Sequence, residues 1–251
     1  MVKNIFDIVS SYLFRKTGYS LIATWRLERY ELTVCLKNIF KKLQIDCVFD
    51  VGANRGQFHD FLRHEVGYRG HIFSFEPVHS LVEHLELCSQ SDPLWHIYPF
   101  ALGAEAGEAE INIMSSDDFS SFRIPDNAQT TEFFGTNAIK QTQTVSIKRF
   151  DDVAREIKEI YSFSNPYLKI DTQGFDLEVI KGAGKLVHNI AAIQCEVSVI
   201  PIYKDIPDYI TTISTLKDID FDLSGLFPVT RDAHLRVIEF DCVAINSRRH
   251  S

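Results

Sequence analysis

The chain has 251 residues, 45% of them hydrophobic, and a formal net charge of -8 at pH 7, an ordinary composition for one sizeable globular domain. It lacks the long lysine and arginine clusters with which proteins bind phosphate backbones, which argues against a nucleic acid partner. The five cysteines form no C-x-x-C pair, and no segment reaches the roughly 20 apolar residues that span a bilayer. We therefore expect a reduced, cytoplasmic protein.

Residues 1–44 are predicted to form an N-terminal helical extension. Apolar residues recur at helical spacing before Arg15 and Lys16, so a first helix should end near Gly18, and a second should cover 24–43. The first helix leaves two alternatives open: it packs against the domain or a partner, or residues 1–16 contact a membrane surface. No cleavage-site pattern follows, which argues against a signal peptide.

Residues 45–251 alternate between strand and helix patterns and predict an α/β fold with a mostly parallel, doubly wound sheet. Ser80 and Glu83 indicate a capping box, and Pro207 suits the first turn of a helix. A long irregular, polar segment containing four phenylalanines should cover 115–143. The expected strands are 47–51, 71–76, 95–100, 109–114, 144–147, 167–171, 190–197, 221–223 and 237–245, with one of the last two antiparallel.

The first strand leads into a distinctive turn, D-x-G-x-N-x-G, formed by Asp50, Gly52, Asn54 and Gly56. A strand, a glycine turn and a helix start are typical of an adenosine-type site at the carboxyl end of a parallel strand. The turn lacks the G-x-G-x-x-G pattern, so it suits a ligand with an amino-acid tail rather than a pyrophosphate. We expect both glycines to let the backbone approach a ligand, and Asp50 to accept hydrogen bonds from loop amides or a ligand ammonium. The alternative is a generic strand-to-helix turn.

Three further acids lie where predicted strands end. Glu76 can accept hydrogen bonds from both ribose hydroxyls of a nucleotide-like ligand, or it is a surface acid before Pro77. Asp171 should face the reacting group, or it caps a turn. Glu196 must line the crevice or find a partner, because it interrupts an apolar run. Tyr203 is expected to wall the acceptor pocket.

Taken together, the motifs resemble the FkbM family of S-adenosylmethionine-dependent methyltransferases. The resemblance rests on FDVGANRG at 49–56, FEP at 75–77, ALG at 101–103 before Gly107, SS at 120–121 and LKIDTQGFDLEVIKGA at 168–183. It runs from about residue 47 to about residue 245 and leaves the N-terminal arm outside. Each block alone is weak, whereas their order and spacing are specific.

The resemblance implies a Rossmann-like class I methyltransferase fold, S-adenosyl-L-methionine as cofactor, and methyl transfer to a hydroxyl of a sugar, glycan or other secondary metabolite. It implies that Glu76 binds the ribose and that Ala101 and Leu102 lie near the adenine. The acid that commonly contacts adenine after the third strand is not evident. The residues implied around the methionine part are Asp50, Gly52, Asn54 and Gly56.

A hydroxyl becomes a better nucleophile when a base takes its proton, and Asp171 is the first candidate base, with Glu196 second. The two acids could instead bind a divalent ion, but no sequence feature requires one and no metal site is expected. A methyltransferase-like binding or scaffold protein without turnover is the main alternative, and the missing G-x-G-x-x-G disfavours a nicotinamide-dependent dehydrogenase. The acceptor should contact 115–143 and the region near Tyr203. A homo-oligomer is left open.

Overall fold

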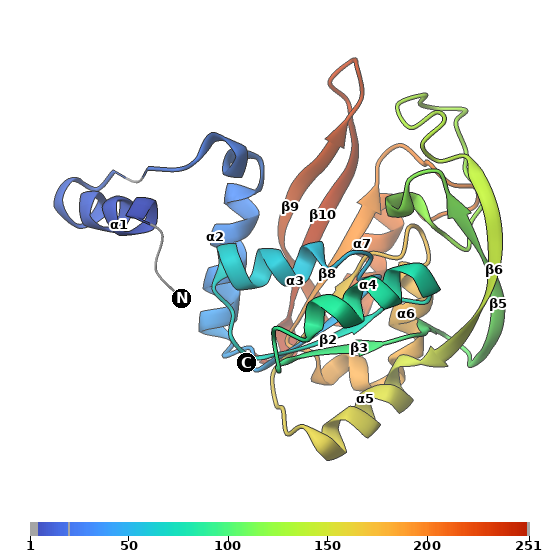
Figure 1. Cartoon of the computed structure of the whole chain (residues 1–251), viewed down its shortest axis with the longest axis horizontal. Coiled ribbons are helices and arrows are strands. Elements are labelled where there is room, and N and C mark those ends of the chain that lie inside the picture. Colours follow the sequence, from blue (N-terminus) through green and yellow to red (C-terminus); the bar gives the residue numbers. More distant parts are fainter. Residues whose placement is uncertain (1–4, 20, 250–251) are drawn as a thin grey trace.

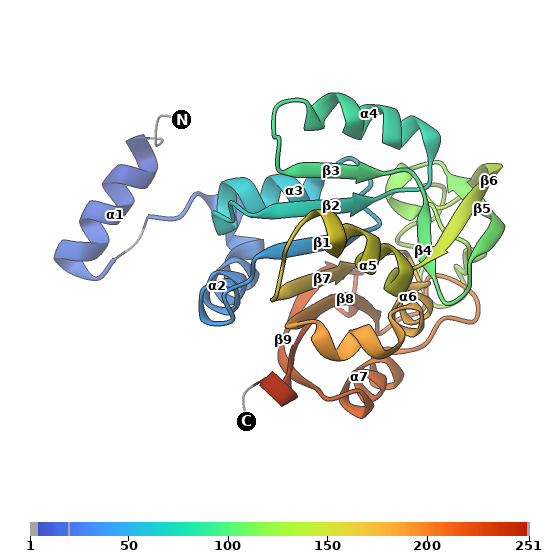
Figure 2. The same cartoon turned by 90° about the horizontal axis from the view of Figure 1, so that it is seen from below.

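The computed structural model describes residues 5–19 and 21–249 and has a central seven-stranded sheet with helices on both faces (Figures 1 and 2). The strand order is β3-β2-β1-β7-β8-β10-β9. All neighbouring pairs are parallel except those that β10 makes with β8 and β9. This confirms the predicted mostly parallel sheet. Its strands are β1 (Cys47–Val51), β2 (His71–Phe75), β3 (Trp95–Tyr98), β7 (Pro166–Ile170), β8 (Ala192–Ser198), β9 (Phe221–Arg231) and β10 (Val237–Asn246).

Helices cover the two sheet faces in groups of three, because successive strand side chains point to opposite faces. In β1, Phe49 packs into the core that includes residues of α5, α6 and α7, whereas Val48 packs with α2, α3 and α4. Buried on both sides, the strands read as almost continuous apolar runs. The helices are α2 (Leu27–Lys42), α3 (Gln57–Phe61), α4 (His79–Ser89), α5 (Phe150–Ile160), α6 (Asp176–Gly182) and α7 (Tyr209–Asp218).

A smaller sheet lies beside the carboxyl ends of the central strands, with the order β4-β6-β5. Its strands are β4 (Ala101–Gly103), β5 (Gly107–Met114) and β6 (Ile139–Arg149). The irregular segment between β5 and β6 is shorter than expected, since β6 begins at residue 139 rather than 144. The first residues of β6 are mostly polar and exposed, so no buried face marked them as a strand in the sequence.

Two predicted helix starts are wrong. α4 begins at His79 without a side-chain cap, so Ser80 and Glu83 form no capping box; the backbone N–H of Val78 donates instead to Glu76 Oε1. α7 is capped by Asp208, which accepts a hydrogen bond from the Thr211 N–H at 2.8 Å. Pro207 therefore precedes the helix, and its fixed φ leads the chain into the cap.

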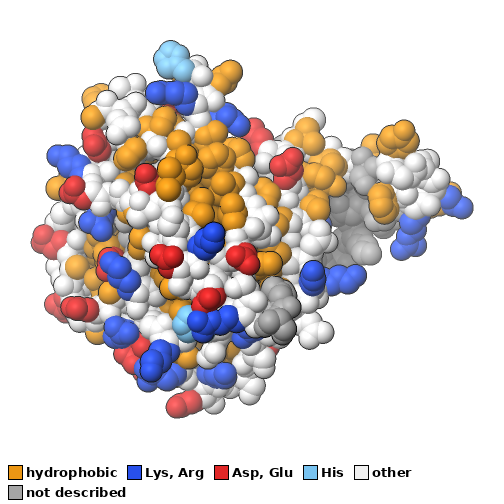
Figure 3. All heavy atoms as spheres, turned by 180° about the vertical axis from the view of Figure 1, so that it is seen from behind, with side chains coloured by type: hydrophobic (Ala, Val, Ile, Leu, Met, Phe, Trp, Pro, Cys, Tyr) orange, Lys and Arg blue, Asp and Glu red, His pale blue; other side chains and the backbone are white. Residues whose placement is uncertain are grey.

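The N-terminal helix α1 (Ile5–Thr17) projects from the body as an arm (Figures 1, 2 and 3). Tyr12 and Phe14 are 63% and 59% exposed, and Arg15 and Lys16 occupy the last turn. No helix in residues 5–19 and 21–249 is both long enough and apolar enough to cross a bilayer. Residues 1–4 of the predicted extension lie outside the described residues, and its division from 45–251 stays a prediction.

Candidate functional site

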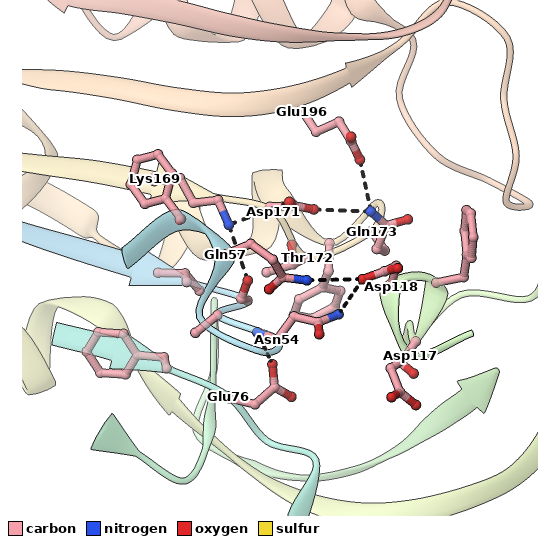
Figure 4. A pocket seen from close by; sticks show the side chains of 18 of the residues that line it. Asn54, Gln57, Glu76, Asp117, Asp118, Lys169, Asp171, Thr172, Gln173 and Glu196 are labelled. Atoms are coloured by element: carbon pink, nitrogen blue, oxygen red, sulfur yellow. Dashed lines mark hydrogen bonds and ion pairs between the residues drawn. The ribbon is translucent and has the colours of Figure 1, made fainter. Parts of the chain in front are cut away.

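A cavity of about 340 Å³ opens at the carboxyl ends of β1, β2, β7 and β8. This volume falls within the usual range of small-molecule pockets, and the position follows the rule for ligand sites in doubly wound sheets. Segment 115–138, which includes Asp117 and Asp118, also contributes to its wall (Figure 4). The hairpin of β9 and β10 contributes Thr230 and Glu239. Seven lining side chains are acidic and two are basic, so the cavity favours cationic or neutral ligands.

A buried ion pair connects β1 to β7 beneath the cavity. Asp50 and Lys169 are register partners on neighbouring strands, so their side chains lie on the same sheet face. Lys169 Nζ lies 3.3 Å from Asp50 Oδ1 and 3.5 Å from Asp171 Oδ2, and it donates to the carbonyl oxygen of Gly52 at 3.2 Å. Burial lowers the pKa of Lys169, but Asp171 and Asp50 outweigh it and raise the pKa above its ordinary value. The lysine is therefore a fixed cation.

Asp50 does not line the cavity. Its side chain is fully buried, and its Oδ2 accepts a hydrogen bond from Ser74 Oγ at 2.9 Å, which in turn accepts one from Trp95 Nε1. Because Asp50 lies within β1, its side chain points under the turn rather than over the strand end. The expected direct contact with loop amides or a ligand is thus replaced by pairing with Lys169.

Gly52 and Gly56 are both crowded positions in the turn, but different neighbours exclude a side chain at each. Gly52 lines the cavity with φ +79°, and a Cβ there would lie 1.8 Å from the backbone oxygen of Asp171. Gly56 has φ +86°, but a Cβ there would lie 2.7 Å from the Trp95 ring, and Gly56 is not part of the cavity wall. The close contact at Gly56 is with Trp95 of β3, and the expected approach of a ligand to Gly56 stays a prediction.

Glu76 and Asn54 line the cavity together. Glu76 is only 5% exposed, which rules out a surface acid; its Oε2 accepts the Asn54 N–H at 2.8 Å and its Oε1 accepts the Val78 N–H at 2.9 Å. Burial raises the pKa of Glu76 to about 7. Asn54 has φ +48°, and its Nδ2 donates to Asp118 Oδ1 at 3.2 Å. Asn54 Oδ1 is buried without a hydrogen-bond partner in the described chain, so the wall offers an unused acceptor.

The predicted adenine region is apolar. Ala101 and Leu102 belong to β4, are buried, and line the cavity. The neighbouring rings Phe122 and Phe175 also line it, with centroids 4.8 Å apart. This part of the wall can take a flat ring by apolar contact.

Asp171 and Glu196 both line another part of the cavity wall, on either side of the Gln173 amide (Figure 4). Gln173 Nε2 donates to Asp171 Oδ1 at 3.1 Å and to Glu196 Oε2 at 3.0 Å. Glu196 is the register partner of Asp241, and Glu239 lies on the same face of β10. Burial and the neighbouring carboxylates raise the pKa of Glu196 well above its ordinary value, and they raise that of Glu239 to about 8.

Sequence reasoning missed several lining residues and misplaced Tyr203. Tyr203 is 2% exposed and outside this wall, with its hydroxyl 2.8 Å from Gln173 Oε1. Alternation of acids with apolar residues in the last strand could have revealed Glu239 and Asp241, since it predicts one polar face. The missed residues include Arg29, Gln57, Gln173, Gln194, Glu239 and Asp241, whereas Asp117 and Asp118 fall in the segment expected to contact the acceptor.

Within residues 5–19 and 21–249, no three or more His, Cys, Asp or Glu side chains are grouped so that they could hold a metal ion. The five cysteines are free thiols, and Cys47, Cys195 and Cys242 are buried. The pKa values of Cys47 and Cys195 are raised above the ordinary value, Cys47 mainly by burial, while a hydrogen bond with Cys242 comes first for Cys195, followed by burial. These thiols are core side chains.

Comparison with known structures places the fold among methyltransferases. A methyltransferase FkbM from Methylobacillus flagellatus KT is 14% identical, with a TM-score of 0.50 over 80% of this chain and 43% of its own. The present chain thus spans less than half of that protein. Aeropyrum pernix fibrillarin, solved with S-adenosyl-L-methionine, is 11% identical (TM-score 0.47; 86% of this chain, 74% of its own).

Magnesium protoporphyrin IX methyltransferase from Synechocystis PCC 6803, also solved with S-adenosyl-L-methionine, is 10% identical (TM-score 0.45; 98% of this chain, 99% of its own). No curated protein matches the sequence. The family model "Methyltransferase FkbM domain" matches residues 50–223, a shorter region than the expected 47–245. The match includes the turn after β1, Glu76, and the segment with Lys169, Asp171 and Gln173. The chain therefore belongs to the FkbM family of methyltransferases, whose fold is the Rossmann-like class I fold and whose cofactor is S-adenosyl-L-methionine.

Proposed function

We propose that this chain transfers a methyl group from S-adenosyl-L-methionine to a hydroxyl of a sugar, glycan or other small secondary metabolite. The observation that carries the proposal is the division of one cavity wall. One part presents Glu76 and the unused Asn54 oxygen, and another presents Asp171 and Glu196. A cofactor site and a proton-accepting site thus share one pocket.

The wall offers partners for three portions of the cofactor: its ammonium group, its ribose and its adenine. Asn54 Oδ1 is an acceptor without a donor, which an ammonium group supplies. Each Glu76 oxygen accepts one backbone N–H and has a further lone pair for a ribose hydroxyl. Ala101 and Leu102 supply an apolar surface for the adenine. When bound, the cofactor supplies the methyl group and retains the electron pair of its carbon–sulfur bond.

Asp171 serves as the base. Its side chain is 39% exposed at the cavity, whereas burial raises the pKa of the Glu196 carboxyl well above its ordinary value. Lys169 Nζ lies 3.5 Å from Asp171 Oδ2 and forms an ion pair with it. Asp171 takes the proton that the acceptor hydroxyl loses, and the pocket contributes by holding the reactants in line.

The acceptor lies between segment 115–138 and the β9–β10 hairpin. Phe119 and Phe133 contribute rings to the wall, whose centroids are 4.8 Å apart, and Thr230 contributes a hydroxyl. Carboxylates accept hydrogen bonds from hydroxyl groups, so this wall suits a polyhydroxylated molecule. The excess of acids makes a phosphate or carboxylate on the acceptor unfavourable.

The first test is isothermal titration of the folded protein with S-adenosyl-L-methionine and S-adenosylhomocysteine, where saturable binding is expected. Failure of both ligands to bind would reject the proposal. Mass spectrometry of a panel of neutral glycans and hydroxylated metabolites should then reveal a gain of one methylene group. Binding without methylation across a broad panel would favour a non-catalytic binding protein.

A further inference from the structure

Gln173 occupies an unusual backbone position between β7 and α6. Its φ is +52°, in the left-handed region that non-glycine residues rarely adopt. The hydroxyl of Ser121 donates to the Gln173 carbonyl oxygen at 2.7 Å. Contacts with segment 115–138 thus help to hold a strained backbone that the local sequence alone does not favour.

The side-chain amide of Gln173 has its polar atoms satisfied in one orientation. The Tyr203 hydroxyl donates to Oε1 at 2.8 Å, while Nε2 donates to both Asp171 and Glu196. Rotating the amide by half a turn would place Oε1 against two carboxylate oxygens, which is unfavourable. The same tyrosine hydroxyl lies 2.8 Å from the carbonyl oxygen of Phe119, so segment 115–138 also contacts the residue that orients the amide.

The two acids would otherwise repel each other. Glu196 has four acidic neighbours: Asp171, which follows β7, Asp176 from α6, and Glu239 and Asp241 from β10. Lys169 is the fixed cation nearby, and it pairs with Asp50 and Asp171 rather than with Glu196. The neutral amide of Gln173 donates a hydrogen bond to each acid, so it stabilises the two side chains near each other without adding charge.

We propose that Gln173 is a positioning residue that holds Asp171 and Glu196 as a pair facing the acceptor hydroxyl, and that segment 115–138 keeps Gln173 in place. The catalytic part rests on the function proposed above, whereas the pairing of the two acids does not. Burial and the surrounding carboxylates raise the pKa of Glu196 above its ordinary value, and Gln173 Nε2 donates to both acids at 3.1 and 3.0 Å.

The test compares Gln173→Leu with Tyr203→Phe, and Gln141→Leu serves as a matched control on the exposed face of β6. In Gln173→Leu, methyl transfer should fall about 10- to 100-fold, part of the usual contribution of a positioned base. Cofactor affinity should stay within about twofold, because the wall around Glu76 is unchanged. Tyr203→Phe should shift the rate in the same direction by a smaller factor, and Gln141→Leu should leave it unchanged.

A readout independent of the acceptor is the pH titration of the Glu196 carboxyl by carbon-13 NMR, assigned with Glu196→Gln. Loss of the amide donor should move this titration to higher pH in Gln173→Leu, and to a smaller extent in Tyr203→Phe. A Glu196 titration identical in wild type and both variants would overturn the pairing. If the Glu196 titration moves to higher pH in the variants as expected, but the protein binds no cofactor, the proposed function is rejected and the pairing of the two acids stays supported.

The shape of the pH–rate profile distinguishes positioning from general damage. A general structural defect lowers the rate by the same factor at every pH. Loss of the Gln173 hydrogen bonds to Asp171 and Glu196 should instead shift the pH values at which the rate rises and falls. An unchanged profile shape in Gln173→Leu, with only a lower maximum, would overturn the positioning role.

Discussion

The parts of the cavity wall that we assign to the cofactor (the cofactor side) and to the acceptor (the acceptor side) are built in different ways. The cofactor side comes mainly from two consecutive strand-to-helix turns, after β1 and β2, with Glu76 bonded to the backbone of both. The acceptor side is assembled from the end of β7, from β8 and β10, and from segment 115–138. Local turns thus fix one side, whereas the other depends on contacts between residues far apart in the chain.

This difference has a functional meaning. A cofactor shared across a family requires the same turn geometry, which short motifs encode. Acceptors differ, and a wall made of separate segments can change by altering one segment at a time. Changes on the two sides should therefore separate cofactor binding from methyl transfer.

The largest effect should come from Asp171→Asn. Removing the base should lower the rate of methyl transfer by roughly 10²- to 10⁴-fold while cofactor affinity changes by less than about twofold. The rate of acceptor methylation is measured for Asp171→Asn and wild type. Asp222→Asn, on the exposed part of β9, serves as the control and should keep the wild-type rate. Turnover equal to wild type would remove Asp171 from the catalytic role.

Gly52→Ala should disrupt the junction between the two sides. Its Cβ would collide with the Asp171 backbone oxygen at a positive φ, so we expect a loss of about 3 kcal/mol in the free energy of unfolding. Gly67→Ala is the matched control, since Gly67 has φ +84° but a Cβ added there would have no neighbouring atom within 4 Å. It should lose only about 1 kcal/mol. Equal losses in urea unfolding would show that the close approach is unimportant.

The pH dependence of stability should reflect the buried acids. The pKa of Glu76 is about 7 in the folded protein against an ordinary 4.5, so the folded state binds more protons between these values. The unfolding free energy should therefore fall as pH rises from about 5 to about 7, by on the order of 2 kcal/mol from Glu76. Glu239, with a pKa of about 8, extends the decline. Urea unfolding of Glu76→Gln should have a weaker pH dependence; the same slope in both proteins would contradict this origin.

Glu76→Gln should also weaken cofactor binding about 10-fold, because one acceptor oxygen becomes a donor toward the ribose. The methylation rate at saturating cofactor should change little, since the acceptor side is intact. Titration calorimetry and saturation kinetics measure the two quantities. A variant that loses turnover but keeps affinity would reverse the assigned division of the wall.

The smallest effect is expected in the arm. Phe14→Ala, at a side chain that is 59% exposed, should change the unfolding free energy by less than about 0.5 kcal/mol. Leu36→Ala in α2, where the side chain is fully buried, should cost about 3 kcal/mol. A large destabilisation by Phe14→Ala would mean that α1 packs on the body in solution.

The sequence predicted the central sheet well because its strands are short apolar runs separated by glycines and acids. The place of Glu76 in the cavity wall was predictable because it directly follows a strand of the parallel sheet. The roles of Asp50 and Gly56 could not be predicted in the same way. Their neighbours Lys169 and Trp95 lie far along the chain, and periodicity does not reveal which side chain will face the cavity and which will pack beneath it.

The acceptor side was predicted only in part. Asp171 and Glu196 lie at strand ends, but the bridge by Gln173 depends on the Tyr203 hydroxyl and on the direction of a left-handed backbone. The polar beginning of β6 also escaped prediction, because an exposed strand lacks the apolar alternation that marks a buried one. Both failures concern interactions that only the folded arrangement creates.

The placement of β10 has a consequence for how the protein is made. β10 follows β9 in the chain but lies between β8 and β9 in the sheet. During synthesis β9 emerges first, yet it has no sheet partner until β10 has been added and inserted beside β8. Since β10 brings Glu239 and Asp241, the cavity is completed by a late, long-range pairing step. A nascent chain that stops before β10 should therefore expose a strand edge and require protection from aggregation.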